Sequence, residues 1–233
     1  MNLAFQLSRL QKIDTELDQI SQRQKDLTRL IEDQSIVDEV KNRLDDVNAE
    51  LASRQRTLKG IEDKNNQLQM KLQEDEHALY AGKIRLPREL QDLQNEIASL
   101  KKQISTQDES QFNTMMQVED QEKQLSGIQA ELAEAQSTFA TRVAGWRGEF
   151  SSLEKKKENL LTERNAAEQN LDTASIQQYE TLRKTKRGLA VALVSEQACA
   201  ACGATLTPAD WQAARSPQRL VFCTSCGRIL YAG

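Results

Sequence analysis

The residues best suited to chemistry are four cysteines near the carboxyl end of the chain. They form two Cys-X-X-Cys pairs, Cys199 with Cys202 and Cys223 with Cys226, and 20 residues separate the pairs. Each pair can present two thiolates from one tight turn, and the glycine that follows each pair permits the positive φ that points backbone amides at sulfur. Two such turns complete a tetrahedral site of four sulfurs with no ligand position left open. The spacing therefore predicts a structural metal site.

Zinc is the metal that this ligand set favours, although four thiolates also hold iron or an iron-sulfur cluster, and oxidised cysteines form disulfides. The first 20 residues carry charges at helical spacing where a signal peptide would have an apolar stretch. No run approaches the roughly 18 apolar residues that a membrane span needs. We therefore expect a cytoplasmic protein without a membrane association, whose thiols stay reduced and bind Zn²⁺.

The composition predicts that long helices must position these cysteines. Of 233 residues, 38% are apolar, 4% are aromatic and 28% are charged, with only 9 Gly and 3 Pro. Sandwiches, barrels and doubly wound sheets need many turns, so the scarcity of turn residues argues against all three classes. The fold class that we expect is mainly α.

Heptad repeats indicate two long coiled-coil helices. In the second, every seventh residue from Leu90 to Ala167 is apolar except Gln111. The first shows the same period from Leu3 to Ile31, and after a shift of frame the repeat resumes at Val37. Such a shift predicts a local overwinding or kink. We interpret the polar seam residues Gln24, Asn65 and Gln111 as determinants of register.

A turn near residues 80–87 connects the two helices. Gly82 suits the left-handed position after a helix end, and Pro87 suits the first turn of the next helix. If Leu79 faces Leu90, the numbers of paired residues add to about 169 along the whole hairpin. Pairing between two chains is the alternative, but closing so short a loop costs little entropy, which favours an antiparallel hairpin within one chain.

The sequence therefore divides into two predicted domains. Residues 1–172 form the long antiparallel coiled-coil hairpin, and residues 173–233 form a short helix followed by the small four-cysteine zinc ribbon. We expect Ser175 to cap that short helix, residues 189–194 to form a buried strand, and Thr207 to cap a second short helix.

The ribbon domain is basic, whereas the hairpin is acidic. Residues 173–233 hold seven Lys and Arg against three acids, a net charge of +4. Because the whole chain carries −4, residues 1–172 carry −8. Four cations gather in one short run, Arg183, Lys184, Lys186 and Arg187. Cations in the last turn of a helix complement its dipole, and four thiolates with one zinc ion reduce the domain charge by 2. We nevertheless predict that these four residues bind nucleic-acid phosphates.

Two segments carry a resemblance to a known family. The hairpin sequence of residues 79–83 followed by residues 87–94, and the ending Cys223-Thr224-Ser225-Cys226-Gly227-Arg228-Ile229-Leu230-Tyr231, resemble those of bacterial coiled-coil proteins with a C-terminal four-cysteine zinc ribbon, described as nucleic-acid-binding proteins. The resemblance implies a zinc ion bound at the four cysteines, a long helical hairpin, and a role in gene expression or complex assembly. Some branches of that family are associated with alternative sigma factor and with flagellar or type III export components.

The sequence predicts a protein that is not an enzyme and has no small-molecule substrate. His77 is its only histidine, and no P-loop, dinucleotide fingerprint or nucleophile motif is present. The leading hypothesis is a nucleic-acid-binding protein that regulates gene expression, with a coiled coil that engages protein partners. The alternative is an adaptor or chaperone-like scaffold for transcription or for secretion and flagellar components. The ribbon aromatics Trp211, Phe222 and Tyr231 suit packing around the zinc turns better than stacking on bases.

Overall fold

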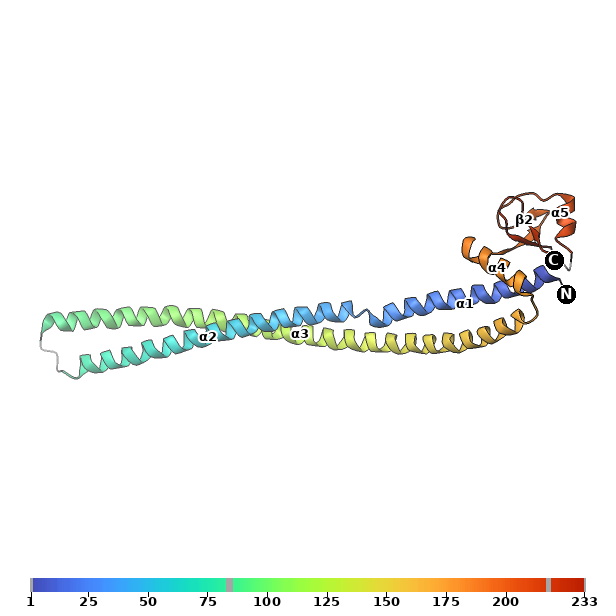
Figure 1. The fold of residues 1–233 in the computed structure, drawn as a ribbon. Helices are drawn as coiled ribbons and strands as arrows, with labels where there is room; N and C mark the ends of the chain where they lie inside the picture. The colour runs from blue at the N-terminus through green and yellow to red at the C-terminus, as the bar shows by residue number, and fades with distance from the viewer. Residues whose placement is uncertain (1, 83–85, 217–218, 233) are drawn as a thin grey trace. The chain divides into compact units, whose positions relative to one another are not determined.

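The structure is a computed structural model that describes residues 2–82, 86–216 and 219–232 (Figure 1). Three long helices make up most of the chain: α1 Leu3–Glu32, α2 Ser35–Tyr80 and α3 Pro87–Glu168. The remaining elements are short: α4 Thr173–Thr185, β1 Val191–Ser195, β2 Ala198–Cys199, α5 Pro208–Ala213, β3 Val221–Phe222 and β4 Ile229–Tyr231. The predicted fold class, a mainly α protein with a small carboxyl-terminal ribbon, is confirmed.

The chain forms two compact units. The hairpin unit comprises Gln34–Thr141, and the ribbon unit comprises Met1–Asp33 together with Arg142–Gly233. The hairpin unit thus contains α2 and the first part of α3. The ribbon unit contains α1, the last part of α3, α4 and the strands. The predicted domain boundary after residue 172 divides the sequence into two continuous segments, whereas the ribbon unit combines residues from both ends of the chain. That boundary stays a prediction.

Within the hairpin unit, α2 and α3 pair antiparallel. Arg43 donates to Glu131 at 2.9 Å, and Lys71 forms an ion pair with Glu96. The numbers in these two pairs add to 174 and 167, near the predicted 169. Gly82 has a φ of +67° after the end of α2, which confirms its predicted role, and α3 begins at Pro87 as expected. Residues 83–85 of the predicted turn lie outside the described residues.

A polar layer interrupts the apolar seam of this unit. The side chain of Asn65 is buried, and its Nδ2 donates to Asp108 Oδ1 at 2.6 Å and to Gln111 Oε1 at 3.3 Å. Two of the polar seam residues singled out in the sequence therefore meet across the helix pair. Because these groups lose hydrogen bonds in any shifted alignment, the contact supports the interpretation that they specify register.

The frame shift in the first heptad series coincides with a helix break. The helix α1 ends at Glu32 and α2 begins at Ser35, and Asp33 between them has an extended backbone with φ −79° and ψ 94°. The frame shift therefore coincides with an interruption of the helix, and not with overwinding of one continuous helix.

The ribbon unit is built around a four-stranded sheet with the order β2-β1-β4-β3. The central strands β1 and β4 are parallel, with Val191 beside Ile229, and the outer pairs are antiparallel. Val191 and Ile229 join a core with Leu7 and Leu10 of α1, whereas the alternate residues join a second core around the cysteines. The predicted strand over residues 189–194 forms as Val191–Ser195, and both faces are buried at Val191 and Ala192, whereas Leu193 is exposed.

The short helix α4 begins earlier than expected, so the predicted cap at Ser175 is wrong. Asp172 is the N-cap, and its Oδ1 accepts a hydrogen bond from the amide of Ser175 at 2.9 Å. The hydroxyl of Ser175 donates to the other carboxylate oxygen at 2.7 Å. Asp caps helices as well as Ser does, and here the serine supports the cap from inside the first turn. Thr207 caps α5 as predicted.

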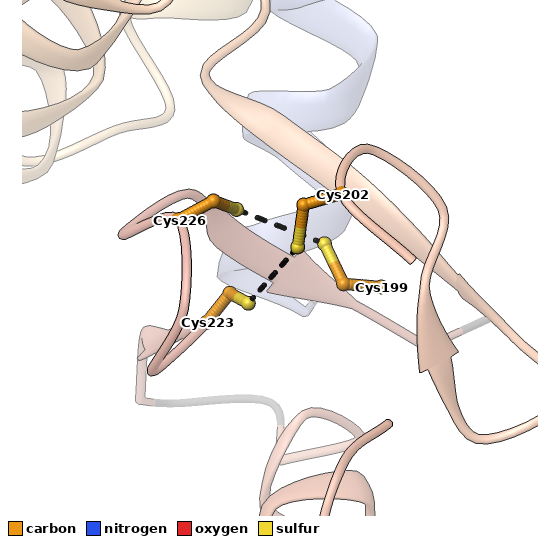
Figure 2. A group of neighbouring side chains, drawn as sticks. All are labelled: Cys199, Cys202, Cys223 and Cys226. Atoms are coloured by element: carbon orange, nitrogen blue, oxygen red, sulfur yellow. Dashed lines mark hydrogen bonds between the residues drawn. The ribbon is translucent and has the colours of Figure 1, made fainter. Parts of the chain in front are cut away.

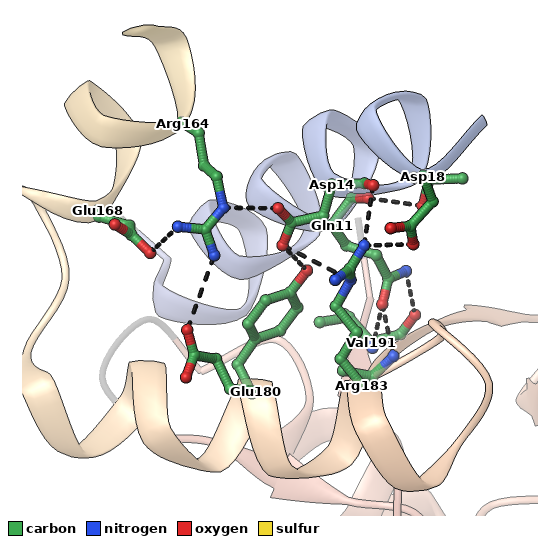
Figure 3. Close-up of polar contacts among 11 residues, drawn as sticks. Gln11, Asp14, Asp18, Arg164, Glu168, Glu180, Arg183 and Val191 are labelled. Atoms are coloured by element: carbon green, nitrogen blue, oxygen red, sulfur yellow. Dashed lines mark hydrogen bonds and ion pairs between the residues drawn. The ribbon is translucent and has the colours of Figure 1, made fainter. Parts of the chain in front are cut away.

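Gln11 of α1 fastens the sheet to the helices of the ribbon unit (Figure 3). Its Oε1 accepts from the amides of Ala190 and Val191 at 2.7 and 2.6 Å, and its Nε2 donates to the Val191 carbonyl at 2.8 Å. Only 9% of the residue is exposed. One side chain thus satisfies three buried backbone groups at the start of β1.

Asp14 lies one turn further along α1 and binds side chains of both α3 and α4. Its carboxylate accepts from Arg164 Nε at 2.7 Å and from the Tyr179 hydroxyl at 2.7 Å, and the residue is 3% exposed. Burial, together with the Asp14 carboxylate, raises the pKa of Tyr179 far above its ordinary value, so the hydroxyl remains a donor. We call Gln11, Asp14, Arg164, Tyr179 and Arg183 the docking network.

Replacing Gln11 should loosen the sheet from α1. In Gln11→Ala, the amides of Ala190 and Val191 and the Val191 carbonyl lose their partner inside the structure, which we expect to cost about 3 kcal/mol. Hydrogen exchange of the two amides should accelerate accordingly. The matched control is Gln19→Ala, an exposed glutamine on the same helix. Protection of residues 190 and 191 equal to that of the control would contradict the role assigned to Gln11.

Candidate metal centre

The four cysteine sulfurs converge on one point, as Figure 2 shows. All four lie within 4.8 Å of one another. Cys199 Sγ is 3.9 Å from Cys226 Sγ, and Cys202 Sγ is 3.7 Å from Cys223 Sγ. A tetrahedron with metal–sulfur distances of about 2.3 Å has edges of about 3.8 Å, so the sulfurs fit a zinc ion at their centre.

A tight hairpin positions the first pair of cysteines. The strands β1 and β2 are joined by Glu196 and Gln197, which both have positive φ, at 49° and 56°. This is the conformation of a type I′ turn, for which Asn and Gly are the usual residues, so Glu196 and Gln197 do not predict it from their types. Cys199 ends β2, and Gly203 has a φ of +74°.

The second pair repeats the geometry of the first between β3 and β4. Gly227 has a φ of +73°, which with Gly203 confirms the predicted role of both glycines. In each turn the glycine amide donates to the carbonyl of the first cysteine at 2.8 Å: Gly203 to Cys199 and Gly227 to Cys223. The two turns therefore present their sulfurs in the same way from opposite sides of the site.

The surroundings of the sulfurs shift the pKa values of two thiols in opposite directions. Burial raises the pKa of Cys199 to about 12, although hydrogen bonds from the Ala201 and Cys202 amides oppose this. Burial acts in the same direction on Cys226, but hydrogen bonds led by that of the Arg228 backbone lower its pKa to about 6. Bound Zn²⁺ stabilises thiolates, and it would hold all four sulfurs deprotonated.

The site is suited to a structural role. Cys199 and Cys223 are buried in the second core of the ribbon unit, beside Leu206 and Leu230. Four thiolates fill a tetrahedral coordination sphere, so no position remains for a substrate or an activated water. A metal ion bound by the four sulfurs would link the two cysteine turns, and with them the start of β4.

The basic segment predicted to bind phosphates is not uniform in the structure. Arg183 is bound to α1: its Nη2 donates to the Asp14 carbonyl at 2.9 Å and to the carboxylate of Asp18 (Figure 3). Lys184 and Arg187 are exposed, and Lys186 is half-buried. The four residues thus lie on one segment, but Arg183 is already bound within the docking network.

Arg228 links this segment to the second cysteine turn. Its Nε donates to the Leu189 carbonyl at 2.8 Å, and its Nη2 donates to the Lys186 carbonyl at 3.3 Å. The sequence predicts no such contacts for Arg228, which it shows only as one positive charge and as part of the family-like ending. Nor does it predict a role for Gln11 or Asp14, although Ala4, Leu7, Gln11 and Asp14 form a second stripe on α1, outside the coiled-coil seam.

Removing one sulfur should release the metal and unfold the ribbon locally. We expect Cys202→Ser to lose stoichiometric zinc, because apparent zinc-binding free energies in comparable four-ligand sites are about 10 to 16 kcal/mol and depend on the full ligand set. Hydrogen exchange should rise across residues 191–231 and stay unchanged across residues 34–141. Ser225→Ala, in the second turn, is the control. Stoichiometric zinc and unaltered protection in Cys202→Ser would show that the sulfurs do not act together.

Two family models match the chain, one over each part. Residues 10–187 match the CT398-like coiled coil hairpin domain, and residues 198–230 match the C4-type zinc ribbon domain. No curated protein matches the chain. The ribbon match and the convergence of the four sulfurs identify zinc as the cofactor.

Solved structures share the fold. The structure of CT398 from Chlamydia trachomatis is 19% identical over 99% of this chain and 98% of that chain, with a TM-score of 0.82. A Mycobacterium smegmatis protein is 19% identical over 100% and 99%, with a TM-score of 0.67. HP0958 from Helicobacter pylori is 19% identical over 97% and 95%, with a TM-score of 0.51. Since the hairpin match alone spans most of the sequence, this chain belongs to the family of CT398-like coiled-coil hairpin proteins.

Proposed function

We propose that this protein is a non-enzymatic zinc-ribbon factor of the cytoplasm that binds nucleic acid and acts in the regulation of gene expression. The observation that carries the proposal is the position of Lys184, Lys186 and Arg187 at the end of α4, beside the second cysteine turn. The zinc site fixes that turn, and Arg228 ties the basic segment to it. The cations are thereby presented on a rigid support.

Helix-dipole compensation explains only part of this positive charge. The last turn of α4 contains Arg183 and Lys184. Lys186 and Arg187 follow the helix, and Arg187 has a φ of +57°. Residues beyond the helix gain little from its dipole, which falls off within the last turn. Since Arg183 is engaged by Asp14 and Asp18, we assign the phosphate contacts to Lys184, Lys186 and Arg187, and Arg183 positions them.

A structural role for the metal supports a function without catalysis. The four-sulfur site is closed, and a coiled-coil hairpin has little interior in which a substrate could be enclosed. Among the residues that the structure describes, no helix has both the length and the apolar character that crossing a membrane requires.

A protein adaptor is the second candidate function, and the hairpin unit supplies the observation that favours it. Phe112, Met115 and Met116 lie on one face of α3 at the spacing i, i+3 and i+4, and Phe112 is 63% exposed. Exposed apolar residues at this spacing suit the docking of a partner helix. In the leading proposal this face binds a protein partner while the ribbon unit binds nucleic acid.

The salt dependence of binding tests the leading proposal. The logarithm of the affinity for single-stranded RNA should fall linearly with the logarithm of the salt concentration. In the triple variant Lys184→Ala, Lys186→Ala, Arg187→Ala, we expect the magnitude of that slope to decrease by about 2, because each released phosphate contact contributes about 0.7. Fluorescence anisotropy over a salt series measures both slopes.

The control triple removes the same charge from the hairpin unit. Lys41→Ala, Lys59→Ala, Lys64→Ala changes three exposed lysines of α2 and should leave the slope unaltered. Equal losses in both triples would mean that only the net charge matters. No detectable binding of RNA or DNA by the wild-type protein at low salt would exclude the proposal and leave the adaptor.

A further inference from the structure

The three ribbon aromatics have different environments, which the sequence could not distinguish. The ring of Tyr231 packs against Phe5, with 5.8 Å between ring centroids. The ring of Trp211 is covered by the Arg215 guanidinium, 4.1 Å from its centroid. Phe222 is 40% exposed. Two of these side chains are therefore engaged within the structure, and Phe222 offers an accessible ring.

Phe222 lines an open hollow of 470 Å³ between α4 and the second cysteine turn. The side of α4 contributes Gln177, Gln178 and Thr181, and the turn contributes Gly227. A Cβ added to Gly227 would meet no atom of the described structure within 4 Å, so this wall of the hollow is bare backbone beside open space. The hollow thus combines an aromatic ring with amide and hydroxyl groups.

We propose that this hollow binds one unpaired base of a single-stranded nucleic acid, stacked on Phe222. The inference rests on the proposed function and names the form of nucleic acid that the ribbon unit recognises. Every base has a π-face that an exposed aromatic ring can stack on. The amides of Gln177 and Gln178 each carry a donor and an acceptor, which match the edges of a base that is not paired. A base within a duplex presents no free face to the ring.

The basic segment lies where the phosphates of such a strand would pass. Gly227 lines the hollow, and the next residue, Arg228, binds the Lys186 carbonyl, so the segment and the hollow share the second cysteine turn. Lys184 follows Thr181 by three residues on α4, which places the two side chains on neighbouring positions of the helix surface. A nucleotide in the hollow therefore has cations within reach of its backbone.

Substitution of Phe222 tests the base site in the full-length, zinc-loaded protein. The probes are a labelled single-stranded RNA of about 12 nucleotides and a duplex of the same sequence. Phe222→Ala should weaken binding of the single strand about 5-fold to 100-fold, with the salt slope and the affinity for the duplex unchanged. Phe222→Trp should restore the affinity, and the strand should quench its fluorescence beyond the quenching seen in the wild-type protein.

Leu193→Ala is the matched control, since Leu193 is an exposed apolar residue of the same sheet that does not line the hollow. Zinc content equal to that of the wild type in each variant establishes that the ribbon is folded. If Phe222→Ala binds the single strand as tightly as wild type while the lysine and arginine triple weakens it, the base site is wrong and the proposed function stands. If the wild-type protein binds neither probe, both fail. Loss of a protein partner in Phe222→Ala without nucleic-acid binding would assign the hollow to that partner.

Discussion

Four thiolates can approach one another to 3.7 and 3.9 Å only if a cation offsets their mutual repulsion, and the rest of the ribbon unit depends on that constraint. Once Zn²⁺ holds the second cysteine turn, it fixes the start of β4 and therefore Ile229, which belongs to the core shared with α1. It also fixes Arg228, whose hydrogen bonds hold the basic segment. The metal thus acts on function through position alone, since it offers no open coordination site.

The docking network explains how a small ribbon can be a rigid part of the ribbon unit. A module of this size buries too little apolar surface to be stable alone, and the sheet gains the core that contains Leu7 and Leu10 by packing on α1. The start of β1 extends beyond its pairing with β2, which would leave backbone groups unsatisfied where it packs on α1, and Gln11 satisfies three of them. Asp14 would be a costly buried charge, but Arg164 and Tyr179 bind it directly.

These contacts also divide the positive charge of the ribbon into two kinds. Arg183 and Arg228 form hydrogen bonds that hold α4 and the turn after it, because a guanidinium can donate to several acceptors at once. Lys184 and Arg187 are exposed and Lys186 is half-buried, and these three remain for the proposed phosphate contacts. The net charge of the domain therefore overstates what a nucleic acid would encounter, whereas the local arrangement beside the hollow accounts for the proposed recognition.

The sequence by itself determined the features that depend on local spacing. The pairs around Cys199 and Cys223, the positive φ of Gly203 and Gly227, the turn at Gly82 and the heptads of the hairpin all follow from residue type and period, because each involves a few neighbouring residues or one repeated contact. Tertiary structure alone decided which face of α1 meets the sheet and that Phe222 keeps an exposed ring. The contacts responsible join residues up to 180 positions apart, as Gln11 and Val191 show, and no local pattern specifies the partner of a buried polar group at that distance.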